Sequence, residues 1–172
     1  MNREEEYMKL EPTTDRIDTV QARPLAELLA CPADTGDLLN SSAQNLDFEA
    51  GESLFCQAAL CRGLYVIVSG QLMRKTDRLD AHLTLGPVRV GDLVELAAVL
   101  GDGHHTYSLA AQTAGSVLLL PIEALQQAFQ AYPRLRMQLL EELAREVSRA
   151  YNFCCLHRVM KTRQKAVPGQ QV

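Results

Sequence analysis

The chain has 172 residues, of which 47% are apolar and 22% are charged, and its formal net charge is -4 at pH 7. This composition is typical of a globular protein with one domain, because the chain is long enough for one core and too short for two ordinary domains. The negative charge gives no overall attraction to nucleic acid, and no apolar run is long enough to span a membrane. The N-terminus lacks the apolar segment of a signal peptide, so we expect a cytoplasmic protein.

The first 132 residues divide into a polar arm and a β-rich segment. Residues 1–22 are polar and predict a flexible N-terminal arm, and the domain is expected to span residues 23–132. Two short helices are predicted at 24–30 and 34–42. Short β-type runs then alternate with turns at 46–48, 53–55, 64–69, 71–74, 81–85, 88–90, 108–112 and 116–120. Many short strands separated by turns favour a closed β architecture.

From Pro121 onward the apolar period changes from two to about 3.6, which indicates helices. After a helix at 122–129, a long helix is predicted over 133–160, followed by a basic flexible tail at 161–172. The long helix has a narrow apolar stripe of the kind that forms a coiled-coil seam, and this predicts a homodimer. Packing of the first half of the helix on its own domain is the alternative. The predicted dimer residues are Leu135, Leu139, Leu143, Val147, Ala150 and Cys154.

Several marks along the chain occur in a characteristic order. They are Gly51-Glu52 before a strand, the strand 64–69 ending at Gly70, Gly91-Asp92 followed by Glu95-Leu96-Ala97, and Ala131-Tyr132-Pro133 before the long helix. In this order they resemble the cyclic-nucleotide-binding domain of the catabolite-activator and fumarate-nitrate-reductase (CRP/FNR) regulator family. The resemblance implies a mainly β fold with flanking helices, a double-stranded β-helix or jelly-roll, followed by a long C-terminal helix.

The resemblance also implies that residues 91–108 correspond to a phosphate-binding cassette. In that family backbone N–H groups and an arginine hold the cyclic phosphate, and a glutamate holds the ribose. Glu95 matches the glutamate, but the preceding glycine is missing and no arginine occurs between Arg89 and Arg134, so His104 or His105 falls on the arginine position. Losing an arginine–phosphate pair costs on the order of 2–5 kcal/mol. Binding of cyclic AMP in the usual way is therefore disfavoured. The candidate pocket residues are Gly91, Asp92, Val94, Glu95, Leu96, Ala97, His104, His105, Thr106, Tyr107 and Tyr151.

Two observations bear on metal binding. The five cysteines lack zinc-ribbon spacing, and their odd number and the missing signal peptide argue against a disulfide framework. The adjacent histidines His104 and His105 would need further ligands such as His82 or Glu95, because neighbouring side chains on a strand point to opposite faces. Surface histidines in a turn are the simpler interpretation. We therefore predict no metal, no cofactor and no catalytic residue, with a cyclic nucleotide possible but disfavoured.

The sequence thus predicts a non-catalytic regulatory or sensor module that forms a homodimer, with an unknown protein partner left open. Three alternatives remain: a ligand-free scaffold, a receptor for cyclic AMP, cyclic GMP or a cyclic dinucleotide that uses histidine in place of arginine, and a cupin-type metal-dependent enzyme. Members of the resembled family continue into a helix-turn-helix domain. Only about a dozen residues follow Met160 here, so we expect no sequence-specific DNA binding.

Overall fold

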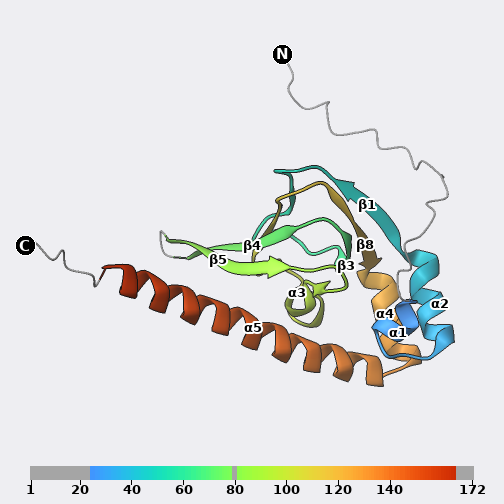
Figure 1. Cartoon of the computed structure of the whole chain (residues 1–172). Coiled ribbons are helices and arrows are strands. Elements are labelled where there is room, and N and C mark those ends of the chain that lie inside the picture. Colours follow the sequence, from blue (N-terminus) through green and yellow to red (C-terminus); the bar gives the residue numbers. More distant parts are fainter. Residues whose placement is uncertain (1–23, 79–80, 166–172) are drawn as a thin grey trace, which may run out of the picture.

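The computed structural model describes residues 24–78 and 81–165, with the side chains at 78–83 and 157–165 left out. These residues form two antiparallel four-stranded sheets with helices at one end and a long helix alongside (Figure 1). The first sheet has the strand order β1 (Gln44–Phe48), β8 (Gly115–Pro121), β3 (Gly63–Ser69) and β6 (Leu93–Val94). The second has the order β2 (Ser53–Phe55), β7 (Ser108–Ala111), β4 (Leu72–Arg78) and β5 (Ala81–Val88). The predicted β-roll with a long C-terminal helix is confirmed.

Strand β3 shows how the sequence separates two apolar cores. Successive side chains of a strand point to opposite faces, so its apolar run is divided between them. Tyr65 and Ile67 join the core between the two sheets, whereas Leu64 and Val66 join a second core beneath the helices. An uninterrupted apolar strand is needed here because both of its faces are buried.

The helices close one end of the roll. Helices α1 (Leu25–Leu28), α2 (Ala33–Ser42) and α4 (Ile122–Ala131) lie together there, and the short helices predicted at 24–30 and 34–42 are confirmed as α1 and α2 (Figure 1). Helix α3 (Leu96–Leu100) contacts the last helix, α5 (Arg134–Lys165). Helix α1 begins at Leu25, one residue later than predicted, and Pro24 is its N-cap instead of its first helical residue.

Helix α5 passes α3 and β5 and continues beyond the sheets (Figure 1). It reaches Lys165, so the prediction of a flexible tail beginning at residue 161 is wrong for residues 161–165. Lys, Arg and Gln in that stretch favour helix, and the first proline follows only at Pro168. The rest of the predicted tail and the predicted arm at 1–22 lie outside the described residues.

The predicted dimer stripe on α5 needs a correction. Leu135 and Leu139 are buried in the core of their own chain, and Leu143 packs against that core. The alternative of packing on its own domain therefore applies to this half of the helix, and among the predicted set Val147 stands out as 59% exposed. A second row of exposed apolar side chains, here called the outer stripe, recurs at steps of three and four: Met137, Leu140, Ala144, Val147 and Tyr151.

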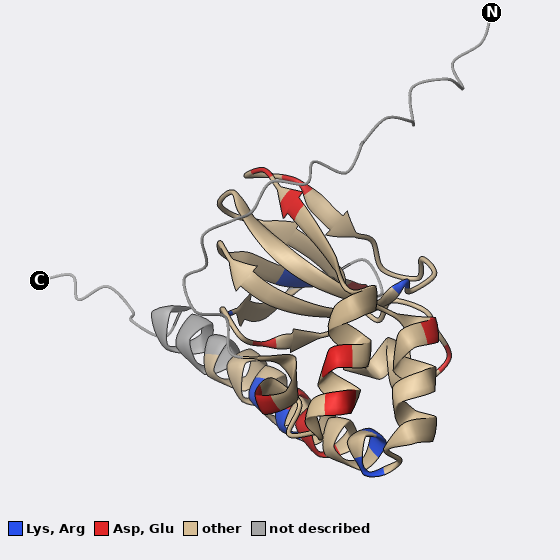
Figure 2. Cartoon of the chain, turned by 90° about the vertical axis from the view of Figure 1, so that its right-hand side faces the viewer, with Lys and Arg blue, Asp and Glu red and all other residues tan. Residues whose placement is uncertain are grey.

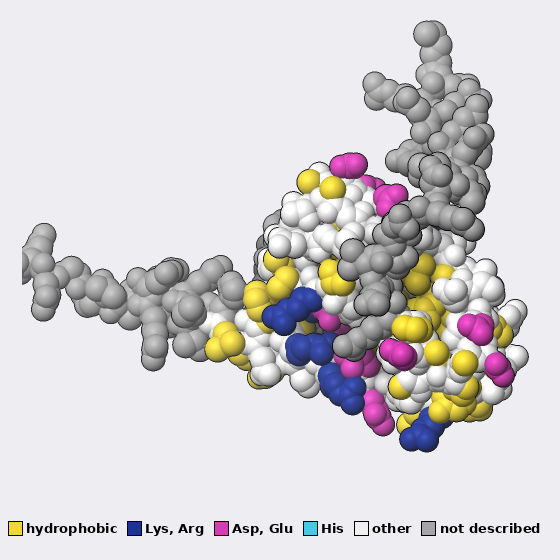
Figure 3. Space-filling view, turned by 45° about the vertical axis from the view of Figure 1, so that its right-hand side comes forward, with side chains coloured by type: hydrophobic (Ala, Val, Ile, Leu, Met, Phe, Trp, Pro, Cys, Tyr) yellow, Lys and Arg dark blue, Asp and Glu magenta, His cyan; other side chains and the backbone are white. Residues whose placement is uncertain are grey.

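Basic and acidic groups alternate along α5 between Arg134 and Arg149 (Figure 2). Glu142 accepts hydrogen bonds from Arg145 at 2.8 Å and from Arg149 at 3.0 Å. In the view of Figure 3, basic and acidic side chains lie next to one another.

Candidate functional site

The segment between β6 and β7 corresponds to the predicted cassette, and Glu95 is its turning point. Glu95 is the N-cap of α3 and has a φ of 78° and a ψ of 23°, in the left-handed region that favours glycine. A non-glycine residue held there costs of order 1–3 kcal/mol, and such strain persists only where the surroundings impose it. The side chain of Glu95 points inward and is 1% exposed.

A neighbouring loop brings two more polar side chains to Glu95. Residues 56–62, between β2 and β3, pair with residues 103–105 through backbone hydrogen bonds. The N–H of His105 donates to Ala59 at 2.9 Å, the N–H of Ala58 donates to His105 at 2.8 Å, and the N–H of Cys61 donates to Gly103 at 2.8 Å. This ladder fixes Cys61 and His105 against each other although they are far apart in the sequence.

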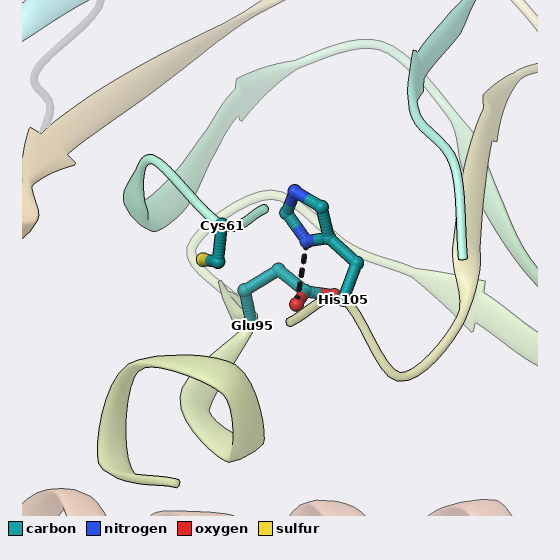
Figure 4. Close-up of side chains that lie close together, drawn as sticks. All are labelled: Cys61, Glu95 and His105. Atoms are coloured by element: carbon teal, nitrogen blue, oxygen red, sulfur yellow. Dashed lines mark ion pairs between the residues drawn. The ribbon is translucent and has the colours of Figure 1, made fainter. Parts of the chain in front are cut away.

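Cys61, Glu95 and His105 form a buried cluster, shown in Figure 4. Their potential ligand atoms all lie within 4.8 Å of one another, and Cys61 and His105 are 8% and 3% exposed. Oε2 of Glu95 lies 2.7 Å from Nδ1 of His105. Neither carboxylate oxygen, nor this nitrogen, has a hydrogen-bond partner of good geometry among the described residues. Unpartnered polar atoms in a core are costly, so the cluster calls for an explanation.

Burial governs the protonation of this cluster. It raises the pKa of Glu95 to about 8, with a smaller contribution from the negative charge of Glu146. It raises the pKa of the Cys61 thiol to about 11, although that thiol donates to the carbonyl oxygen of Gly63 at 3.2 Å. It lowers the pKa of His105. Each shift favours the neutral form, as expected for polar groups enclosed by apolar side chains.

The ring of His105 is fixed by an aromatic neighbour. It stacks on Phe55 of β2 with ring centroids 4.0 Å apart and planes 7° from parallel. Tyr65 and Tyr107 pack against the same phenyl ring at 5.3 Å and 5.9 Å. The imidazole is therefore held beside Glu95 by packing as well as by the backbone ladder.

A second polar group joins the roll to α5. Arg74 of β4 and Glu146 of α5 form a buried ion pair, and Arg74 also lies over the ring of Tyr107. The hydroxyl of Tyr107 donates to Oε1 of Glu146 at 3.2 Å and accepts a 3.4 Å hydrogen bond from the backbone N–H of Glu95. Burial raises the pKa of Glu146, and Arg74 opposes this. Tyr107 thus bridges the cassette and the long helix.

The structure brings together only part of the predicted pocket. Glu95, His105 and Tyr107 converge in the interior, whereas Val94 and Leu96 are core residues. The predicted pocket residues therefore divide into a polar group around Glu95 and residues whose side chains fill the apolar cores.

The remaining predicted pocket residues lie elsewhere. His104 is exposed beside Asp102, so of the two histidines only His105 reaches the interior. Tyr151 is 70% exposed on the outer stripe, and its assignment to the pocket is wrong, because the preceding turns of α5 direct it away from the roll. Ala97 is half-buried and Thr106 is exposed.

Gly91 and Asp92 belong to a different hollow. They form the turn before β6, in which Oδ2 of Asp92 accepts the N–H of Arg89 at 2.9 Å. This turn lines a cavity of about 350 Å³ between α1 and α5, together with side chains such as Leu29 and Arg145. Gly91 and Asp92 are therefore separate from the buried cluster around Glu95.

Sequence reasoning missed three residues that matter here: Cys61, Arg74 and Glu146. Cys61 has no ligand spacing to its nearest cysteine, Cys56, which is exposed. Arg74 and Glu146 read as surface charges on a strand and a helix. Strand alternation was the available signal for Arg74. Leu72 and Arg74 are two residues apart on one strand, so their side chains share one face, and both are buried.

A β-roll with a short helix between β6 and β7 and a long C-terminal helix is the architecture of a cyclic-nucleotide-binding-type domain. The family model of the cyclic nucleotide-binding domain matches residues 45–132, just over half of the chain. The chain therefore belongs to the cyclic nucleotide-binding domain family. This agrees with the resemblance seen in the sequence.

Individual relatives support this membership. The fumarate and nitrate reduction regulatory protein of Vibrio cholerae is 31% identical over 101 residues, covering 58% of this chain and 40% of the Vibrio protein. The N-terminal domain of a transcriptional regulator from Streptomyces coelicolor has a TM-score of 0.56 at 22% identity, covering 87% of this chain and 95% of that one. Thermus thermophilus catabolite activator protein has a TM-score of 0.59 at 22% identity, covering 81% and 63%. The two structural similarities show the fold alone.

The chain spans less than half the length of the Vibrio regulator. Within residues 24–78 and 81–165, no helix is both long and apolar enough to cross a membrane.

Proposed function

We propose that this chain is a non-catalytic regulatory module that dimerises through the outer stripe of α5 and does not bind cyclic AMP in the manner usual for the family. The observation that carries the proposal is the bridge from the cassette to α5 through Tyr107 and Glu146. A regulatory domain needs a physical link between its ligand site and the element that responds, and this bridge provides one.

The side chains around the cassette argue against a bound cyclic nucleotide. Glu95, the residue matching the ribose ligand, faces His105 at 2.7 Å instead of an open pocket. The buried arginine nearest to the cassette bridge, Arg74, is paired with Glu146 and would have to exchange a protein carboxylate for a phosphate. Removing one partner of a buried ion pair costs about 3–5 kcal/mol, which would be subtracted from the binding free energy of the nucleotide.

The proposed signal is a change in the position of α5. A change that moves the backbone of Glu95 alters its hydrogen bond to Tyr107, and Tyr107 contacts α5 directly at Glu146. Arg74 attaches the same glutamate to β4, so the roll and the helix share one buried polar junction. Buried junctions of this kind have few alternative arrangements, which suits a two-state response.

The outer stripe supports the proposed dimer. Met137 and Val147 are each 59% exposed, and the stripe continues through Leu140, Ala144 and Tyr151 with the 3,4 spacing of a heptad seam. A second copy of the same helix is the proposed occupant, because a heptad stripe is complementary to itself across a two-fold axis.

Two measurements test this function on the full chain in a chelating buffer. Light scattering after size exclusion should give the mass of a dimer for the wild-type chain and the mass of a monomer for Val147→Glu. The control is Asn152→Glu, which is exposed on another face of α5 and should leave the dimer intact. Calorimetric titration with cyclic AMP, cyclic GMP and cyclic di-GMP should show no binding at submillimolar concentrations. A monomeric wild-type chain, or saturable binding of cyclic AMP, would overturn the proposal.

A further inference from the structure

We propose that Cys61, Glu95 and His105 are ligands of a zinc-type divalent transition-metal ion, with water or another small ligand in the fourth position. This inference goes beyond the proposed function, because a dimeric module that rejects nucleotides need not bind a metal. It differs from the metal site that the sequence considered, which relied on His104 and His105 together. The fold separates that pair and supplies Cys61 instead.

The distances suit a tetrahedral site after a small adjustment. Zinc lies about 2.0–2.3 Å from nitrogen, oxygen and sulfur ligands, so the ligand atoms of a tetrahedral site are about 3.3–3.7 Å apart. In the cluster the potential ligand atoms all lie within 4.8 Å of one another, and Oε2 of Glu95 lies 2.7 Å from Nδ1 of His105. Movements of about 1 Å or less would bring every pair into the required range. Figure 4 shows the three side chains converging from separate loops.

The buried atoms of the cluster lack other partners. Both oxygens of Glu95 and Nδ1 of His105 are inaccessible to solvent and form no hydrogen bond of good geometry with the described residues. A metal ion would accept a lone pair from one oxygen of Glu95, one ring nitrogen of His105 and the sulfur of Cys61 at once. The 2.7 Å contact with His105 can occupy one oxygen of Glu95, but the other oxygen has no donor among the described residues, and the nearby thiol is a weak donor that already donates to Gly63.

The charges balance when the metal binds. Cys61 binds as a thiolate, Glu95 as a carboxylate and His105 as a neutral imidazole, so these ligands carry two negative charges against the two positive charges of the ion. The thiol proton and the carboxyl proton leave to solvent. A neutral site is what a buried position requires, because an uncompensated charge there is expensive.

The ligand set selects the class of metal. One thiolate sulfur, one imidazole nitrogen and one carboxylate oxygen are typical of Zn²⁺ and of Co²⁺ in its place. Ca²⁺ and Mg²⁺ prefer sites made of oxygen alone. Three protein ligands leave one coordination position free, which is the arrangement of zinc sites that bind an exchangeable ligand.

The site is also positioned by rigid surroundings. The backbone ladder between residues 58–61 and 103–105 holds two of the ligands, and stacking on Phe55 orients the imidazole of His105. The third ligand, Glu95, is held by its left-handed backbone conformation. A preformed site loses little conformational entropy when an ion binds.

The test is a titration of the chelator-stripped full chain with Co²⁺, followed by Zn²⁺. We expect the visible bands of tetrahedral Co²⁺ and a thiolate-to-metal charge-transfer band in the near ultraviolet, both lost on adding one equivalent of Zn²⁺ per chain. Absence of the thiolate band in the wild-type chain would overturn the proposal, whatever the nucleotide and dimer measurements show.

Matched variants identify the ligands. Cys61→Ser and His105→Gln should weaken Co²⁺ binding by at least about 100-fold, since even residues behind the ligands contribute 10- to 100-fold. Their exposed neighbours provide the controls, Cys56→Ser and His104→Gln, which should bind Co²⁺ as the wild type does. Loss of the thiolate band in Cys56→Ser, or its retention in Cys61→Ser, would overturn the assignment. If a ligand variant does not fold by circular dichroism, the wild-type titration decides.

Discussion

Arg74 of β4 and Glu146 of α5 form an ion pair whose side chains are each only 8% exposed. The pair joins one sheet to the long helix across 72 residues of sequence. Tyr107 completes the junction, because its hydroxyl donates to the same carboxylate and its ring lies beneath the guanidinium group. The position of α5 on the roll thus depends on a few buried polar contacts as well as on apolar packing.

Replacing one partner of this pair should be far more damaging than replacing both. Arg74→Met leaves the carboxylate of Glu146 buried without its counter-ion, and we expect the free energy of unfolding to fall by about 3–5 kcal/mol. The double variant Arg74→Met with Glu146→Leu should be much closer to the wild type, because it removes both charges. Urea denaturation of the wild type, both single variants and the double variant gives the coupling energy. A coupling energy near zero would show that the two side chains do not depend on each other.

Tyr107→Phe isolates the bridge between the cassette and α5. The change removes a hydroxyl and leaves the N–H of Glu95 and one oxygen of Glu146 short of a partner, so we expect a loss of about 1–3 kcal/mol. Amide hydrogen exchange in α5 near Glu146 should become faster. Tyr151→Phe removes an exposed hydroxyl from the same helix and should change stability by less than about 0.5 kcal/mol. Equal effects of the two changes would contradict the bridge.

The fold could be predicted from the sequence because its signals are local. The apolar strand 64–69, the turn glycines and the change of period at Pro121 each specify an element, and most elements appear in the order predicted. The strand predicted at 88–90 is wrong, because Val88 ends β5, and the two-residue strand β6 was too short to be predicted. The cassette could be placed for the same reason, since it lies between two recognisable strands.

The site could be predicted only in part because its partners are distant in sequence. Glu95 was identified, but Cys61 reaches it through a backbone ladder between two loops that no short spacing records. Arg74 and Glu146 were missed because a charged residue is assigned to the surface unless its partner is known. The stripe on α5 was misassigned because two apolar rows run along one helix, and sequence alone does not say which row the roll covers.

The two rows on α5 should respond differently to truncation. Leu139 lies in the core of its own chain, so Leu139→Ala should lower the free energy of unfolding of each protomer by about 2–5 kcal/mol. Met137→Ala on the outer stripe should leave protomer packing nearly unchanged and weaken the dimer instead. Chemical denaturation at several protein concentrations separates the two effects, since only dimer dissociation depends on concentration. If both variants lose stability by similar amounts that depend on protein concentration, Leu139 belongs to the dimer interface and the correction made above is wrong.

Glu95 should make the stability of the metal-free chain fall as the pH rises toward 8. Burial raises its pKa from 4.5 to about 8, so in this range the folded chain keeps a proton that the unfolded chain releases. Rising pH therefore favours unfolding. His105 opposes this below pH 6.5, because burial lowers its pKa and the unfolded chain then binds the extra proton.

The window for the measurement is therefore between about pH 6.5 and pH 8, where the stabilisation due to the protonated carboxyl is progressively lost, by about 1–2 kcal/mol. The groups facing Glu95 are His105, Cys61, Tyr107 and Glu146. Cys61 and Tyr107 keep their protons in this window because burial raises the pKa of each. Denaturation in a chelating buffer should show the decline in the wild type and in Glu123→Gln, an exposed control, but not in Glu95→Gln. A decline of the same size in Glu95→Gln would assign the pH dependence to another group.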